Sequence, residues 1–166
     1  MGRLVEGKWR TGSIITSDKK GSYDRIPRSF RDSISKVGPF SPESGRYHLY
    51  VSYACPWAHR TLIYRELKEL QNHISVSVVH PDMMDQGWTF ETNFSDTTGD
   101  DLYHQSHLFE IYQKAKTDVS TSVTVPVLWD KKHQTIVNNE SSEIIRFFNQ
   151  EFDEMTGNEE DYYPKA

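Results

Sequence analysis

Cysteine is almost absent from this sequence, since the chain of 166 residues contains only Cys55. A single cysteine excludes an internal disulfide, and it excludes zinc and iron–sulfur centres that require several thiolates. Long hydrophobic runs are absent as well, because no apolar segment approaches the roughly 18 residues that a membrane-spanning helix needs. Residues 1–10 lack the apolar segment of a signal peptide. These absences predict a cytoplasmic protein in a reducing compartment, with no membrane partner.

Basic residues are scarce beyond the N-terminal part of the chain. Residues 1–46 carry 10 lysines and arginines against 5 acids, whereas the whole chain carries 19 against 24. The basic residues form no dense run and no aromatic–basic motif, so we expect no nucleic-acid partner.

The chain divides into three parts by composition. Residues 1–44 are rich in Gly, Ser, Pro and charge and show little periodicity, which predicts an irregular N-terminal arm. The regular part, residues 45–152, has a length that suits one domain. Residues 153–166 form an acidic tail that we expect to fray.

Hydrophobic periodicity predicts strands and helices in a definite order within the regular part. Strands are expected at residues 47–52, 74–80, 125–129 and 134–137, and helices at residues 56–70, 102–116 and 141–152. A long polar loop, residues 81–101, follows the second strand. A strand–helix–strand unit implies parallel pairing, and the later hairpin adds antiparallel strands. The order predicts a thioredoxin-like α/β domain, with a mixed four-stranded sheet and helices on both faces.

Cys55 stands where the first predicted strand gives way to the first predicted helix, directly before Pro56. Proline favours the first helical turn, so the sulfur would lie beside unpaired N–H groups and the positive end of the helix dipole. Both favour the thiolate, which is the nucleophilic form. His59 and Arg60 on the same opening turns would add positive charge if their side chains point that way. The alternative is a small buried apolar residue, but the position at the helix start favours a reactive thiol.

The spacing around Cys55 constrains its redox chemistry. Ala58 occupies the position at which a C-x-x-C motif has its second thiol. A disulfide formed at Cys55 must therefore be resolved by an external thiol, and glutathione is the obvious candidate in a cytosol. The single cysteine thus favours glutathione-dependent chemistry over dithiol oxidoreductase chemistry.

Two further segments suit a peptide-like thiol ligand. Pro126 cannot donate a ladder hydrogen bond, which indicates an edge strand or a cis bond and leaves the Val125 backbone free to pair with an extended ligand. At residues 139–142, a polar turn opens the last predicted helix, where free N–H groups and a hydroxyl suit a carboxylate. An ordinary edge strand, and simple N-capping by Ser141, explain the same residues without a ligand.

The run Cys-Pro-Trp-Ala-His-Arg at residues 55–60, within the segment 46–63, resembles the catalytic segment of the S-glutathionyl-hydroquinone reductases, the xi class of glutathione transferases. Four more segments follow in the same order as in that family: 86–90 (QGWTF), 97–100 (TTGD), 124–130 (TVPVLWD) and 139–141 (NES). The resemblance runs from about residue 7 to residue 152 and implies the N-terminal, thioredoxin-like domain of such an enzyme.

The resemblance implies the chemistry of the thiol. Cys55 would attack the sulfur of a glutathionyl-hydroquinone, which releases the hydroquinone and leaves glutathione on the enzyme. A second glutathione would then attack this mixed disulfide and leave as glutathione disulfide. Tyr53, Pro56 and Trp57 would shape the approach to the sulfur.

The resemblance also implies how glutathione is held. Val125 would pair with it through the backbone beside a cis Pro126, and Trp88 on the long loop would pack over the tripeptide. Glu140 and Ser141 would hold its γ-glutamyl end. Glutathione is therefore expected as the co-substrate.

Histidines at positions 104 and 107 are three residues apart on a predicted helix. Because two imidazoles without further ligands make a poor metal site, we expect no metal.

The chain departs from the family in two respects. Members are typically longer, with a helical C-terminal domain that supplies the wall of the hydroquinone pocket and the dimer contacts. Residues 153–166 would be the start of a linker to that domain, so helix faces that pack on it would be exposed. We expect self-association or an unstable surface, unless the arm at residues 1–44 covers these faces. Ser122 occupies a position that is commonly basic in the family, which predicts weaker glutathione binding unless another residue supplies the charge.

Several functions remain open beside the reductase. The domain could bind glutathione but turn over poorly, or it could dock a protein partner with Cys55 incidental. A general thioltransferase or dehydroascorbate reductase is a further alternative. Most of the family's dimer contacts lie in the helical domain, so homodimerisation also stays open.

Overall fold

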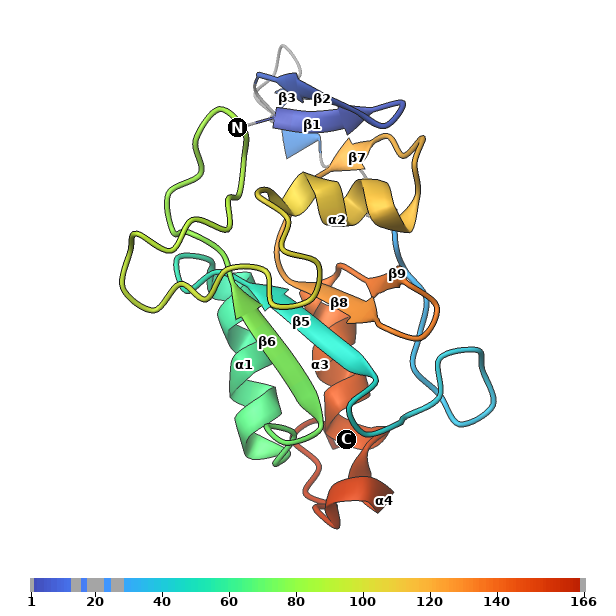
Figure 1. Ribbon diagram of the computed structural model, residues 1–166. Helices are drawn as coiled ribbons and strands as arrows, with labels where there is room; N and C mark the ends of the chain where they lie inside the picture. The colour runs from blue at the N-terminus through green and yellow to red at the C-terminus, as the bar shows by residue number, and fades with distance from the viewer. Residues whose placement is uncertain (1, 13–15, 18–22, 25–28, 165–166) are drawn as a thin grey trace.

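The computed structural model describes residues 2–12, 16–17, 23–24 and 29–164 (Figure 1). A four-stranded sheet lies at its centre in the order β6-β5-β8-β9. Its strands are β5 (Tyr47–Val51), β6 (Ile74–Val78), β8 (Val127–Asp130) and β9 (Thr135–Asn138). β5 pairs in parallel with β6, whereas β8 pairs antiparallel with both β5 and β9. The predicted mixed four-stranded sheet is confirmed.

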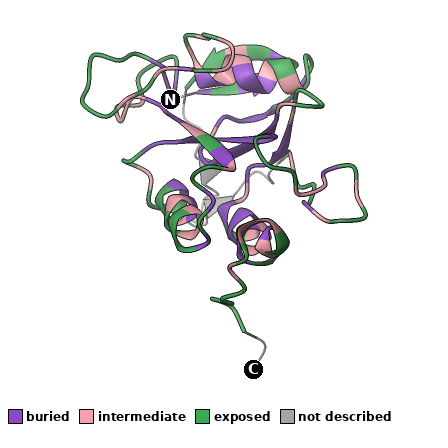
Figure 2. Cartoon of the chain, turned by 60° about the horizontal axis from the view of Figure 1, so that its bottom comes forward, coloured by how far each residue is buried: buried purple, intermediate pink, exposed green. Residues whose placement is uncertain are grey.

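Helices cover both faces of this sheet, as predicted. α1 (Pro56–Leu67) and α3 (Ser141–Gln150) lie together on one face, and α2 (Leu108–Ala115) lies on the other (Figure 2). All five residues of β5 are buried, which follows from its central place between two covered faces. The core also includes Trp129 of β8, whose indole N–H donates to the Tyr103 hydroxyl at 3.0 Å.

A buried ion pair closes one end of the sheet. Arg46 Nε and Nη2 donate to the two carboxylate oxygens of Asp130 at 2.9 and 2.7 Å, and the two side chains are 2% and 0% exposed. Burial alone would raise the pKa of the Asp130 carboxyl, but hydrogen bonds from Arg46 and from the Lys132 N–H hold that pKa below its usual value. The pair ties the residue before β5 to the last residue of β8.

The second helix begins later than the spacing of apolar residues predicted. The predicted start at residue 102 is wrong, since α2 begins at Leu108. The Asp100 carboxylate accepts the N–H groups of Leu102 and Gln105 at 3.1 and 3.0 Å, which holds the intervening residues in turns. His104 has a positive φ of 54°, a conformation that a helix does not contain.

The other helices end earlier than predicted. α1 ends at Leu67 rather than at residue 70, and Glu69 beyond it has a φ of 56°. α3 ends at Gln150, two residues before the predicted end. Such differences are common at helix ends.

The expectation of an irregular N-terminal arm is wrong for part of residues 1–44. β1 (Gly2–Val5) and β2 (Lys8–Thr11) form a hairpin, and β1 also pairs with β7 (Thr121–Ser122). The three strands lie together beside α2 (Figure 1). β3 (Thr16–Ser17) pairs with β4 (Tyr23–Asp24). Residues 13–15, 18–22 and 25–28 of the arm lie outside the described residues.

The expectation that the tail frays is also wrong for residues 153–163. Lys68 is fully buried at the end of α1, where its Nζ lies 2.9 Å from an Asp153 carboxylate oxygen and donates to the Glu160 carbonyl at 2.6 Å. Asn149 donates to the Asp161 carboxylate at 2.6 Å. A short helix, α4 (Asp153–Thr156), is thereby held against the ends of α1 and α3.

Candidate functional site

Cys55 is the N-cap residue of α1, with Pro56 as the first residue of the helix, as the sequence predicted. The Cys55 N–H donates to the Ser52 carbonyl at 3.1 Å, and its own carbonyl accepts the His59 N–H at 2.9 Å. No side chain of the described residues caps this helix end, and the first turn contains no acid. The partly buried thiol therefore belongs to the residue that opens a helix which no described side chain caps.

A cis peptide bond lies next to the thiol. The Val125–Pro126 bond is cis, so the interpretation of Pro126 as marking a cis bond is confirmed. Cys55 Sγ donates to the Val125 carbonyl at 3.7 Å, a contact between residues 70 positions apart. β8 begins only at Val127, rather than at residue 125 as predicted. The Val125 N–H bonds to none of the residues that the structure describes, so a ligand backbone can pair with it.

The N-terminus of α3 forms the opposite side of the site. The N-cap residue is Glu140, whose carboxylate accepts the N–H and the hydroxyl of Ser142 at 3.2 and 3.1 Å. The interpretation of Ser141 as the capping residue is therefore wrong. The Ser141 hydroxyl instead accepts two hydrogen bonds from Arg60, at 3.1 and 2.7 Å.

A small cavity of about 50 Å³ lies between these elements. Its lining comes from the start of α1, the cis-proline loop and the turn before α3: Trp57, Arg60, Val125, Pro126, Asn139, Glu140 and Ser141. Five of these residues are predicted site residues, and the structure brings them together. The sequence prediction included residue 139 in the polar turn without giving Asn139 a role of its own, and it expected Arg60 to add charge at the sulfur rather than to bond to α3. No local pattern indicates either role.

Other predicted residues lie around the cavity or apart from it. Tyr53 and Trp57, beside the thiol, are 56% and 53% exposed, which leaves their rings open to an approaching substrate. Trp88 is only 7% exposed and packs in the core, and it does not line this cavity. Its predicted packing over the tripeptide stays a prediction.

Tyr112 of α2 holds two walls of the site together. Its hydroxyl donates to the Thr124 carbonyl at 2.8 Å and accepts from the Asn139 side-chain amide at 3.1 Å. The cis-proline loop and the turn before α3 are thus joined through one buried side chain.

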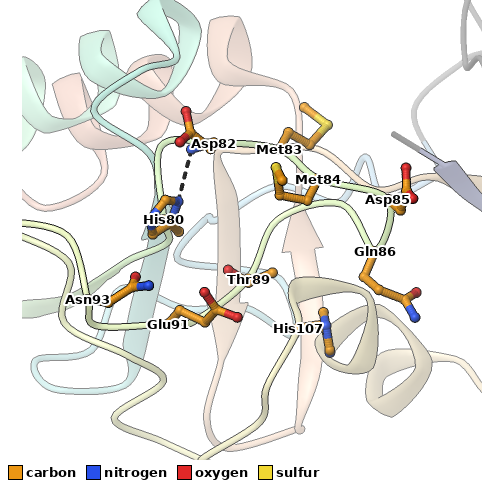
Figure 3. Close-up of a pocket in the computed structure, with 10 residues that line it drawn as sticks. All are labelled: His80, Asp82, Met83, Met84, Asp85, Gln86, Thr89, Glu91, Asn93 and His107. Atoms are coloured by element: carbon orange, nitrogen blue, oxygen red, sulfur yellow. Dashed lines mark hydrogen bonds between the residues drawn. The ribbon is translucent and has the colours of Figure 1, made fainter.

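A larger hollow of about 630 Å³ lies elsewhere, along the loop after β6 (Figure 3). The side chains around it come from residues 80–93 and from His107 at the start of α2, and most of them are exposed. His80 accepts the Asp82 N–H at 3.1 Å on its rim. None of the predicted site residues lines this hollow, so the chemistry of the smaller cavity, and not size, identifies the candidate site.

The described residues contain no group of three or more His, Cys, Asp or Glu placed to hold a metal ion. His104 lies in a turn and His107 is the N-cap of α2, so the two histidines do not share a helix as predicted. Within the same described ranges, no helix is long and apolar enough to cross a membrane.

The fold and the site together define a thioredoxin-like domain with one cysteine at the start of its first helix and a cis-proline loop beside it. The family model described as "Glutathione S-transferase, N-terminal domain" matches residues 54–151. The chain belongs to this glutathione S-transferase family.

Individual relatives and solved structures are similar to nearly the whole of this chain. The chain is 49% identical over 174 residues to "Glutathionyl-hydroquinone reductase YqjG" of Escherichia coli, covering 100% of this chain and 53% of that protein. The structure of a xi-class transferase from Natrialba magadii has a TM-score of 0.90 and 48% identity, covering 100% of this chain and 51% of that one. The glutathione-bound structure of YqjG has a TM-score of 0.83 and 47% identity, covering 98% and 50%.

These comparisons confirm the resemblance to glutathionyl-hydroquinone reductases and xi-class transferases. The chain spans about half the length of the relatives that it matches.

Proposed function

We propose that this chain carries the thiol half of a glutathione-dependent reductase of S-glutathionyl-hydroquinones, with Cys55 as the nucleophile. The Cys55 thiolate attacks the glutathione sulfur of the substrate, and the bond between sulfur and the ring carbon breaks. The ring takes the electron pair and a proton from solvent and leaves as the hydroquinone. A second glutathione thiolate attacks the resulting mixed disulfide, which restores Cys55 and releases glutathione disulfide.

The observation that carries this proposal is the position of the thiol. Cys55 Sγ lies at the uncapped start of α1, 3.7 Å from the Val125 carbonyl and beside the cis bond to Pro126. The open helix end places unpaired backbone N–H groups near the reacting sulfur. The second step needs an external thiol, because no other cysteine exists in the chain.

Glutathione is the co-substrate that we expect beside the thiol. The Val125 N–H and carbonyl would pair with its extended backbone, as in strand addition. Glu140 and Ser141, which line the cavity at the start of α3, would hold its γ-glutamyl group. The glutathione-bound structure of the relative YqjG supports this assignment. Arg3 of β1 lies directly across from Ser122 and is a candidate to supply the basic charge that the family resemblance expects there.

A second function, glutathione binding with little turnover, is favoured by one observation. The outer face of α1 exposes Trp57, Ile63 and Leu67, at 53%, 47% and 39%. Large exposed apolar side chains on one helix suit a surface that binds another protein or domain. If a helical domain on this face forms the wall of the hydroquinone pocket, the chain by itself would bind glutathione but reduce hydroquinone adducts slowly.

Steady-state reduction of a glutathionyl-hydroquinone with added glutathione tests the proposal, with Cys55→Ser beside the parent chain. We expect turnover that is lost in Cys55→Ser, while calorimetry still detects glutathione binding to that variant. Turnover that persists in Cys55→Ser would exclude Cys55 as the nucleophile. Binding without turnover in the parent chain would favour the second function. Dehydroascorbate and a glutathionylated peptide, assayed in parallel, separate the reductase from a general thioltransferase.

A further inference from the structure

We infer that Arg60 is a positioning residue that forces the Ser141 hydroxyl to act as a hydrogen-bond donor. The γ-glutamyl carboxylate, which the proposed function already brings to Ser141, then accepts a hydrogen bond whose direction Arg60 fixes. The inference rests on the proposed function, since it concerns the orientation of glutathione in that site.

The hydrogen-bonding capacity of the Ser141 hydroxyl is limited. A serine hydroxyl has one hydrogen to donate and two lone pairs to accept with. Arg60 Nε and Nη2 both donate to Ser141 Oγ, at 3.1 and 2.7 Å, and so occupy both lone pairs. The only capacity left is the O–H. Ser141 is 4% exposed and lines the cavity, and none of the described residues accepts that hydrogen.

The direction of this hydroxyl selects an anion. Ser141 is the first residue of α3, where the helix dipole is positive and the Ser141 N–H bonds to none of the described residues. The hydroxyl and the Ser141 N–H are both donors, and the Arg60 guanidinium adds positive charge behind them. A carboxylate is the ligand group that satisfies this set.

The same cavity also contains acceptors. Asn139 Oδ1 is buried and has no hydrogen-bond partner among the described residues, and the residue lines the cavity. The Glu140 carboxylate lies beside it with a negative charge. Acceptors for an ammonium and donors for a carboxylate within about 50 Å³ fit the two charged groups of one α-carbon. Glutathione has that pair only at its γ-glutamyl end.

Arg60 is fixed by contacts on other sides. Its guanidinium lies over the Trp57 ring, 5.0 Å from the ring centre, and its Nη2 is 3.9 Å from a Glu140 carboxylate oxygen. The side chain is one-third exposed, so solvent screens part of its charge. Its main effect is therefore the fixed geometry of two N–H groups on a single oxygen. The ammonium of a lysine at this position is a single donor point and lacks that planar fork.

Calorimetric binding of three peptides tests the inference. The peptides are reduced glutathione, its analogue without the γ-glutamyl α-carboxylate, and its analogue without the α-amino group. We expect the parent chain to bind the decarboxylated peptide roughly tenfold or more weakly than glutathione, because a charge-assisted hydrogen bond is lost. Arg60→Gln should bind glutathione more weakly than the parent chain does, by a similar factor. It should discriminate little between glutathione and the decarboxylated peptide.

Three controls separate this effect from damage to the fold. Arg146→Gln removes an arginine that also lies over an aromatic ring, that of Tyr163, but outside the cavity, and it should leave all three affinities unchanged. Arg60→Lys should recover only part of the selectivity. In Arg60→Gln, the preference for the α-amino group should persist, which an unfolded site would not show.

The outcomes are distinct. If Arg60→Gln keeps the parent's preference for glutathione over the decarboxylated peptide, the inference is wrong while the proposed function stands. If the parent chain binds none of the peptides, both are wrong. A preference that disappears in Arg60→Gln, and is retained in Arg146→Gln, supports the positioning role.

Discussion

The sheet body and the outer layer of this molecule are held together in different ways. The sheet body is the four-stranded sheet with α1 and α3, and the outer layer is the β1–β2 hairpin with β7 and the loop after β6. Consecutive ladders and a buried ion pair hold the body. In the layer, Trp9 of β2 donates from its indole N–H to the Asp85 carbonyl at 3.1 Å and stacks on Phe109 at 5.0 Å.

This difference has a consequence for the site. The thiol, the cis-proline loop and the start of α3 belong to the body, whereas Trp88 lies in the loop after β6, which is part of the layer. Within the layer, the Trp9 side chain joins the hairpin to the loop after β6, and a loop held through one side chain opens at lower cost than a buried ladder. We therefore expect the body to keep the cavity in shape and the layer to respond to single substitutions. The following experiments test that comparison.

The largest effect is expected at the ion pair of the body. Asp130→Asn leaves the Arg46 guanidinium, 2% exposed, without its buried counter-charge, which should lower the free energy of unfolding by about 3–5 kcal/mol. Urea denaturation measures it. Lys36→Gln is the control, because it removes an exposed ion pair with Glu154 and should change little. Equal losses of stability in the two variants would contradict a larger contribution of the buried pair.

Acid should destabilise the body through His48 on β5. Its ring is 1% exposed, and burial lowers its pKa from 6.5 to about 4, with Lys131 adding to the effect. The unfolded chain therefore takes up a proton at a higher pH than the folded chain does. The stability is complete above about pH 6.5 and falls by about 3 kcal/mol as the pH drops to about 4.

Denaturation in urea at several pH values checks this effect. In His48→Gln, stability should depend less on pH between 6.5 and 4, whereas His59→Gln, which removes an exposed ring, should keep the parent's dependence. If the free energy of unfolding changes with pH in His48→Gln as it does in the parent chain, other groups cause the acid sensitivity.

The aromatic anchor of the layer comes next in size. Trp9→Ala removes the stacking on Phe109 and the bond to the Asp85 carbonyl, which we estimate at about 2 kcal/mol for a partly buried tryptophan. Hydrogen exchange should accelerate at the Gly87 N–H in the loop. The Val79 N–H, which donates to the Val51 carbonyl in the body, should keep its protection. Equal acceleration at both amides would mean that the layer and the body open together.

Two glycines give the smallest and sharpest comparison. Gly45 before β5 and Gly87 in the loop have φ values of 74° and 76°, so alanine is strained by about 1 kcal/mol at either position. A Cβ at Gly45 meets nothing within 4 Å, but at Gly87 it would lie 2.8 Å from the Trp9 ring. Denaturation should show a greater loss for Gly87→Ala than for Gly45→Ala. The excess should vanish in the Trp9→Ala background, and an excess that persists would exclude the ring as its cause.

Prediction from sequence was more accurate for the body than for the layer. Strands of the body were predicted to within about two residues, because their alternating or continuous apolar residues record burial locally. The strands of the arm were missed, since β1 pairs with β7 and the two lie far apart in the sequence. The start of α2 was misplaced because the Asp100 side chain, and not periodicity, determines the backbone there.

The sequence by itself determined the chemistry of the site: a single thiol, a proline that starts the helix after it, and a second proline that interrupts a later strand. These are local features, because each depends on the residue type and its immediate neighbours. Only the tertiary structure decided which groups meet. The Val125 carbonyl reaches a sulfur 70 residues away, and Arg60 bonds to a serine 81 residues away. Such contacts depend on how the sheet aligns its loops and helices, and no spacing in the sequence records that alignment.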